Sequence, residues 1–175
     1  QNTLKPIRTI HGYVGINYKM EPKYPLISIY NHALELIPDS SILTKATVWA
    51  ILNDDTISVA FDGDGRLWNY QLTAENIKDN FLTRLLSNTV YNPTVEVQPE
   101  WTLKRNYELD KLKSSINGLV DKDDDILTQF VEPETLKQAI TDSETFEQIY
   151  AVLNKYVFDV DEEELWKEEE KNKKN

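Results

Sequence analysis

Residues 47–72 read TVWAILNDDTISVAFDGDGRLWNYQL, and this stretch decides the class of fold that the sequence predicts. It contains three short runs in which apolar and polar residues alternate, at 47–52, 56–61 and 66–72. Two groups of turn-forming residues, NDD and DGDG, separate these runs. Short alternating runs that are joined by such turns pair in antiparallel order. The sequence therefore predicts a three-stranded antiparallel meander within residues 45–72.

Helices are expected on both sides of the meander. Apolar residues three or four positions apart between 26 and 37 predict a helix that ends before Pro38, although LISIY at 26–30 is also a β-prone run. Thr73 has the position of a helix N-cap, and the following apolar residues lie four apart, at Ile77, Phe81 and Leu85. Residues 1–92 are therefore predicted to form an α+β body.

The second half of the chain is expected to be helical. Residues 93–99, which begin and end with proline, are predicted to form a connector. After it, apolar residues recur at helical spacing, and Thr141 and Glu144 have the spacing of a capping box. The predicted fold class is α+β, with a meander plus helices in the N-terminal half and a helical C-terminal half. We expect an acidic helical region at 100–158 and a charged tail, helical or flexible, at 159–175.

Charge and composition limit the partners of the chain. The net charge is −11 over 175 residues, and residues 101–166 alone carry −9. This excess of acid argues against direct binding to nucleic acid or to anionic lipid. The absence of cysteine excludes disulfides, thiolate zinc sites and cysteine nucleophiles, and favours a cytoplasmic or virion setting. No signal segment opens the chain, and no apolar run reaches the roughly 18 residues of a membrane span.

One acidic stretch has the spacing of a calcium loop. Asp121, Asp123, Asp125 and Glu132 occupy positions 1, 3, 5 and 12 of such a loop. Position 6 requires glycine for a sharp turn, but the residue there is Ile126. The pattern therefore favours an acidic turn that caps the next helix, with a calcium site as the alternative. No cofactor is expected from the sequence, and calcium is the alternative.

Tryptophans mark the candidate surfaces for a protein partner. Trp49 and Trp68 lie in the predicted meander, where they form either its core or an exposed binding platform. Leu165 and Trp166 lie in the segment DEEELWK, which is typical of a short acidic docking segment or of a terminal helix that packs on the body. His11 and His32 have no spacing that indicates a metal site or a general base, so no catalytic residue is assigned.

Three hypotheses of function follow from these patterns. The first is a non-enzymatic interaction or assembly subunit or adaptor, which binds a protein partner or further copies of itself. The cysteine-free composition, rich in Asn, Lys and Ile, fits a phage or viral origin for such a subunit. The second is an acidic inhibitor that competes for a nucleic-acid-binding surface of a host protein. The third is an enzyme that depends on carboxylates or on a divalent metal.

Overall fold

The computed structural model describes residues 20–30, 33–53, 58–75, 77–89, 92–123 and 126–161. This part of the chain contains α-helices and two antiparallel sheets, which confirms the α+β class. The main sheet has five strands in the order β2-β1-β4-β5-β7. Their bounds are β1 Leu26–Tyr30, β2 Ala33–Ile37, β4 Ser58–Asp62, β5 Arg66–Thr73 and β7 Gln98–Asn106.

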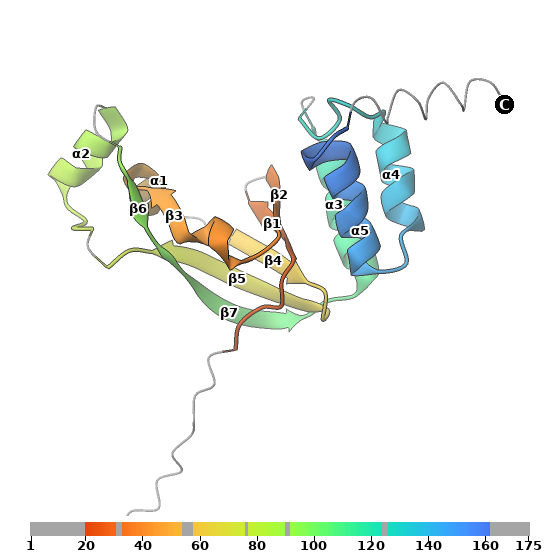
Figure 1. Ribbon diagram of the computed structural model, residues 1–175, viewed down its shortest axis with the longest axis horizontal. Helices are drawn as coiled ribbons and strands as arrows, with labels where there is room; N and C mark the ends of the chain where they lie inside the picture. Colours follow the sequence, from red (N-terminus) through yellow and green to blue (C-terminus); the bar gives the residue numbers. More distant parts are fainter. Residues whose placement is uncertain are drawn as a thin grey trace, which may run out of the picture.

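The helices gather at opposite ends of this sheet (Figure 1). At one end lie α3 Leu109–Val120, α4 Pro133–Asp142 and α5 Phe146–Leu153, followed by a π-helical turn at Asn154–Phe158. At the other end lie α1 Val48–Asn53 and α2 Phe81–Thr89. A small second sheet of β3 Lys45–Thr47 and β6 Thr94–Glu96 joins this end to the main sheet, next to a 3-10 turn at Ser40–Thr44.

The predicted meander is partly wrong. Its second and third runs form β4 and β5, which pair with Ala60 opposite Trp68. The first run is not a strand, because residues 48–53 form α1. The other side of β4 is occupied by β1, which comes from earlier in the chain. Because β1 and β5 pair with the two sides of β4, no position beside β4 remains for residues 47–52. Most of these residues form α1 instead, in which the Ala50 N–H donates to Thr47 Oγ1 at 3.3 Å.

The helix predicted between residues 26 and 37 is also wrong. This segment forms two antiparallel strands, with Leu26 paired to Ile37 and Tyr30 paired to Ala33. Because β1 is a central strand, Leu26 and Ile27 are both fully buried although they point to opposite faces. A strand buried on both faces reads as a continuous apolar run, which also matches helical spacing. The competing β interpretation of 26–30 was the correct one.

The predicted division into an α+β half and a helical half is not confirmed. Residues 98–106 form β7, which pairs along β5 as an edge strand, and α3 begins only at Leu109. Short β6 lies inside the predicted connector. The sequence EWTLKRN at 100–106 alternates well enough for a strand, and β5 offers it a ladder of hydrogen bonds. Whether the chain divides into domains near the connector stays a prediction.

Two of the helices in the second half agree with the sequence pattern. Helix α4 lies within the region predicted to be helical, and Phe146, Ile149 and Leu153 share the buried face of α5. The expected capping box is misplaced, because Thr141 lies in the last turn of α4. The N-cap of α5 is instead Thr145, whose Oγ1 accepts a hydrogen bond from the Gln148 N–H at 3.2 Å.

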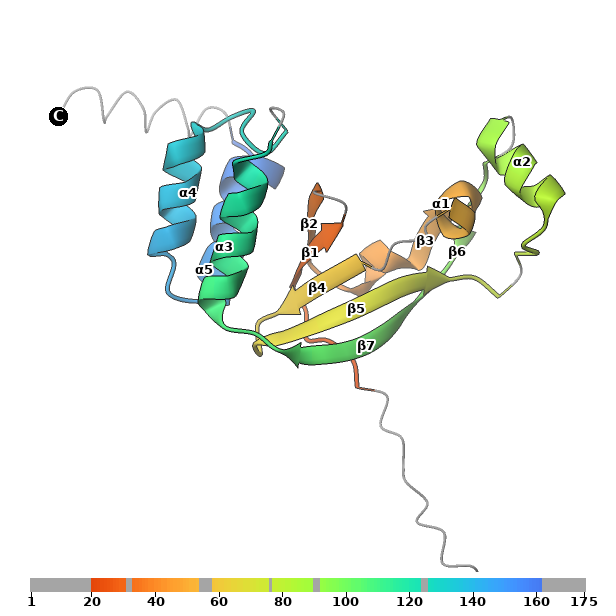
Figure 2. The same ribbon diagram turned by 180° about the vertical axis from the view of Figure 1, so that it is seen from behind.

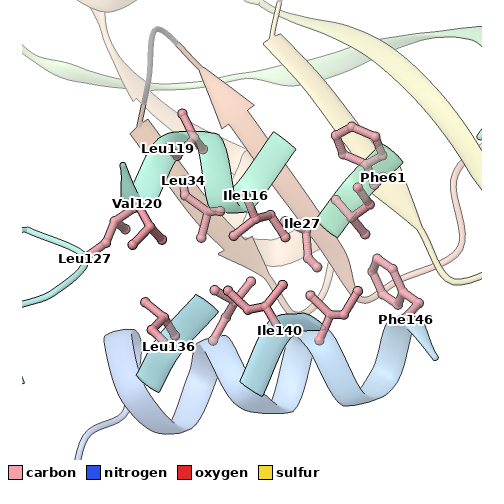
Figure 3. Close-up of a cluster of buried hydrophobic side chains, with 13 residues drawn as sticks. Ile27, Leu34, Phe61, Ile116, Leu119, Val120, Leu127, Leu136, Ile140 and Phe146 are labelled. Atoms are coloured by element: carbon pink, nitrogen blue, oxygen red, sulfur yellow. The ribbon is translucent and has the colours of Figure 1, made fainter. Parts of the chain in front are cut away.

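The core has two parts, one on each face of the main sheet. The larger part joins Ile27, Leu34 and Phe61 of the sheet to α3, α4 and α5, as Figure 3 shows. The smaller part lies on the opposite face and contains Leu26, Ile37, Leu43, Ala60, Trp68 and Tyr70. Both parts lie away from α1 and α2, so the helices at that end belong to neither cluster.

Candidate functional site

The elements α1 and α2 form a separate end of the molecule, which we call the tip. Figures 1 and 2 show it from two sides, at the opposite end of the sheet from α3, α4 and α5. Three hydrogen bonds hold its base together: Val97 N–H to Thr44 O, Val48 N–H to Pro93 O, and Trp49 N–H to Asn92 Oδ1, at 2.9 to 3.0 Å. The segments that lead into and out of the tip are therefore joined to each other by hydrogen bonds.

Helix α2 is amphipathic, but its apolar residues lie on the outside. The exposed fractions are 80% for Phe81, 61% for Leu82, 48% for Leu85 and 42% for Leu86. Its buried residue is Ser87, which is only 4% exposed. A surface helix of a globular protein ordinarily turns its apolar stripe inward. We call the four exposed residues Phe81, Leu82, Leu85 and Leu86 the tip patch.

Local hydrogen bonds explain how a serine can occupy the inner face of α2. Ser87 Oγ donates to the Arg84 carbonyl oxygen at 3.0 Å, so its hydroxyl is satisfied within the helix. The helix is short, and among the described elements it packs mainly against the six residues of α1, in which Val48 and Leu52 are buried. The buried face of α2 thus carries a small residue, and the bulky apolar side chains lie on the exposed face.

Capping and an ion pair define the start of α2. The Asn80 side-chain oxygen accepts from the Thr83 N–H at 2.9 Å, which satisfies one of the first free donors of the helix. Arg84 donates twice to Asp79, with Nε to Oδ1 at 2.6 Å and Nη2 to Oδ2 at 2.9 Å. These hydrogen bonds from Arg84 lower the pKa of Asp79. The charges beside the tip patch therefore neutralise each other.

Trp49, one of the residues predicted to bind a partner, belongs to the tip. It lies on α1 and is 45% exposed, so it adds an aromatic surface next to α2. Trp68 is placed differently, since its side chain is fully buried in the smaller core. The residues Leu165 and Trp166, with His11 and His32, lie outside the described part of the chain.

The buried carboxylate of Asp62 is the centre of the strongest polar cluster. It accepts hydrogen bonds from Arg66 Nε and the Arg66 N–H at 2.9 Å and from the Trp68 indole at 2.8 Å. Further donors are the backbone N–H groups of Asp64 and Lys23, at 3.1 and 3.4 Å. Every donor comes from the β4–β5 hairpin or from the segment before β1, so the cluster fixes this turn and the acceptor positions are filled.

A tyrosine completes this structural cluster. The hydroxyl of Tyr107 donates to the Asp62 carbonyl oxygen at 2.8 Å, and its ring meets that of Phe61 edge to face. Burial, together with the charges of Asp62 and Glu147, raises the pKa of Tyr107 well above its usual value. A phenol held in this state stays protonated at neutral pH, so it serves as a hydrogen-bond donor and not as a base.

The described residues of the predicted calcium loop have separate roles. Asp121 is 60% exposed and pairs with Lys137 at 2.9 Å. Asp123 Oδ2 accepts from the N–H groups of Leu127 and Thr128 and from the Thr128 hydroxyl, and thereby closes the turn. Glu132 precedes α4 without a side-chain capping bond. Asp125 is outside the described residues, among which no group of three metal-ligating side chains occurs. The calcium site stays a prediction.

A hollow of about 860 Å³ lies beside the base of the tip, between β6 and the ends of β5 and β7. Its polar lining includes Lys45 and three glutamates, Glu75, Glu96 and Glu100. The described residues that line it include no histidine and no serine to act as base and nucleophile. In the part of the chain that the structure describes, no helix is long and apolar enough to span a membrane.

No match to this chain is found among protein families, curated proteins or solved structures. The candidate site must therefore be judged on its own geometry. Sequence reasoning missed the tip patch because Phe81 and Leu85 were assigned to a face of a helix that begins at Thr73. That residue ends β5 instead, and Asn80 caps the helix. The serine at position 87, on the side of α2 opposite its leucines, was the available signal.

Proposed function

We propose that this chain is a non-enzymatic interaction or assembly subunit that binds a protein partner through the tip patch. The observation that carries the proposal is the reversed burial of α2, in which Ser87 is buried while Leu82 and Leu86 are exposed. Exposed apolar patches of this kind mark sites of protein contact. A helix that turns its apolar face outward has the geometry of a helix that packs against a partner.

The size of the apolar surface supports this function. Full burial of a leucine or phenylalanine side chain from water contributes about 1.5–3 kcal/mol, and the four residues of the tip patch, which are 42–80% exposed, can contribute roughly 3–7 kcal/mol together. Association costs roughly 4–15 kcal/mol in lost freedom of motion. The two effects are of similar size, so additional contacts from Trp49 and from the edge of the patch decide the affinity. We expect specific binding of moderate strength.

The proposal is tested by affinity capture with the full chain as bait. A double variant, Leu82→Ser with Leu86→Ser, removes half of the tip patch without touching the inner face of α2. Ile126→Ser is the matched control, because Ile126 is 76% exposed and lies in the loop before α4, at the other end of the molecule.

The expected result is that proteins bound by the wild-type chain and by the Ile126→Ser control are lost from the double variant. Circular dichroism and thermal melting establish that all three chains are folded. Equal binding by the double variant and the wild type would refute the proposed site. Loss of binding in the Ile126→Ser control would indicate that the interface lies at the helical end of the molecule.

A further inference from the structure

We propose that the occupant of the tip patch is a second copy of this chain, which forms a two-fold dimer by contact between the two tips. This inference rests on the proposed function and names its partner. In a two-fold dimer, the same surface of both subunits must be complementary to itself. The tip patch meets this requirement, because its four residues are uncharged and the same apolar side chains would face each other.

The charges beside the patch also suit contact between like surfaces. Asp79 and Arg84 provide one negative and one positive group at the start of α2, joined by two hydrogen bonds. A surface with both signs is neutral towards a copy of itself, and under two-fold symmetry each acid can face the base of the other copy. A partner with a strong excess of either charge would gain nothing from this site.

The distribution of charge over the whole molecule favours the same arrangement. Among the described residues, those at 109–123 and 126–161 comprise 5 lysines against 10 aspartates and glutamates, a net charge of −5, and the helices α3, α4 and α5 in these ranges lie at the end opposite the tip (Figure 1). Contact between two tips places the acidic ends of both copies as far apart as the molecule allows. Repulsion between charges separated by more than the Debye length, about 10 Å at 0.1 M salt, is largely screened. Contact through the helical ends would instead bring the acidic surfaces together.

A lipid surface fits the tip less well. Helices that lie on membranes have a polar face rich in Lys and Arg, which binds anionic headgroups. The polar residues of α2 are Thr83, Arg84, Ser87, Asn88 and Thr89, so the helix has one basic residue, and that residue pairs with Asp79. The net charge of −11 adds repulsion from anionic lipid.

The first test measures the mass of the full chain in solution by sedimentation equilibrium, over about three orders of magnitude in concentration. The wild type and the Ile126→Ser control should pass from monomer to dimer with the same dissociation constant. In the Leu82→Ser/Leu86→Ser variant, loss of two apolar contacts from each copy should weaken the dimer at least about 100-fold. A dimer of unchanged affinity in this variant would overturn the inference.

The second test locates the contact by cross-linking. The reaction is specific to the introduced thiol, because the chain has no cysteine of its own. Asn88→Cys places one thiol on an exposed position of α2, and Ser114→Cys places one on an exposed position of α3. A short thiol-reactive cross-linker should join two copies of the Asn88→Cys chain and leave the Ser114→Cys chain monomeric. The reverse result, or equal cross-linking of both, would overturn the inference.

Two other outcomes separate this inference from the proposed function. If the chain stays monomeric at all concentrations, yet a captured protein is lost from the double variant, the partner is a different protein and only the further inference fails. If the monomer binds vesicles of neutral phosphatidylcholine and the double variant does not, lipid is the occupant and both proposals fail.

Discussion

Helices α2 and α5 have similar N-terminal sequences, but their apolar faces differ in burial. Each starts with a phenylalanine after a capping residue, Phe81 after Asn80 and Phe146 after Thr145. Phe146 is 4% exposed, whereas Phe81 is 80% exposed. The spacing of apolar residues therefore shows which side chains share a face, and it does not show whether anything covers that face.

The difference arises from what each helix has beside it. Helix α5 packs with α3 and α4 over one face of the main sheet, and Ile149 is fully buried there. Among the described elements, helix α2 contacts mainly the short α1, and its Ser87 side chain is buried. One apolar face stabilises the fold, and the other is exposed and is the surface that we propose for binding.

The largest expected effect comes from removing equivalent apolar groups at the two ends. Ile149→Ala should lower the free energy of unfolding by about 2–5 kcal/mol, because it leaves a cavity among α3, α4 and α5. Leu82→Ala should change it by less than about 0.5 kcal/mol, since that side chain is already in water. Urea denaturation of both variants as monomers measures the two values. Similar losses would mean that the tip patch is part of the core.

A second pair of variants reverses the usual rule for an amphipathic helix. Ser87→Leu should destabilise the chain by about 1–3 kcal/mol, because a larger side chain must fit at a position that is only 4% exposed. Leu86→Ser, at the neighbouring exposed position, should change stability by less than about 0.5 kcal/mol. Thermal unfolding of the two chains decides the order. A more stable Ser87→Leu chain would show that the orientation of α2 is wrong.

Loss of the α2 cap should have a smaller and local effect. Asn80→Ala removes the acceptor for the Thr83 N–H and should destabilise the helix by about 1 kcal/mol, which corresponds to roughly fivefold faster amide exchange in α2. The exchange of α5, capped separately by Thr145, should not change. Asn88→Ala, an exposed substitution within the same helix, is the control. Faster exchange in both variants would indicate general fraying and not loss of a cap.

The smallest expected effect concerns the ion pair beside the patch. The pKa of Asp79 is lowered in the folded chain, so the pair with Arg84 is intact at neutral pH and is lost as the pH falls through that pKa. Arg84→Gln should raise the pKa of Asp79 towards its usual value. Titration of the carboxyl carbon by NMR measures this shift. An unchanged pKa would mean that Arg84 does not hold the carboxylate.

Local signals in the sequence predicted the parts of the fold that depend on neighbouring residues. The DGDG turn and its two strands, and the helices around Leu136 and Ile149, follow from turn chemistry and periodicity. The order of the sheet could not be predicted, because β1 beside β4 and β7 beside β5 are pairings between distant segments. The sequence places residues 100–106 in a helical region, whereas the structure has β7 there, for the same reason.

The candidate site was predicted only in part. The sequence predicts Trp49 as a candidate binding residue on a strand, whereas it lies on α1; its binding role stays a prediction. The tip patch could not be recognised from spacing, because Phe81 and Leu85 fit a buried helical face equally well. Whether a helical face is covered depends on the elements that pack beside the helix. For α2 that element is α1, which follows directly on β3, and β3 is held by its pairing with β6.

Hydrogen exchange of the full chain at a low and a high concentration tests the central claim most directly. The tip is predicted to be the surface that associates, so peptides covering residues 48–53 and 81–89 should exchange more slowly at high concentration. Peptides from α4 and α5 should exchange at the same rate in both samples. Protection of α4 and α5 with no change at the tip would contradict the account.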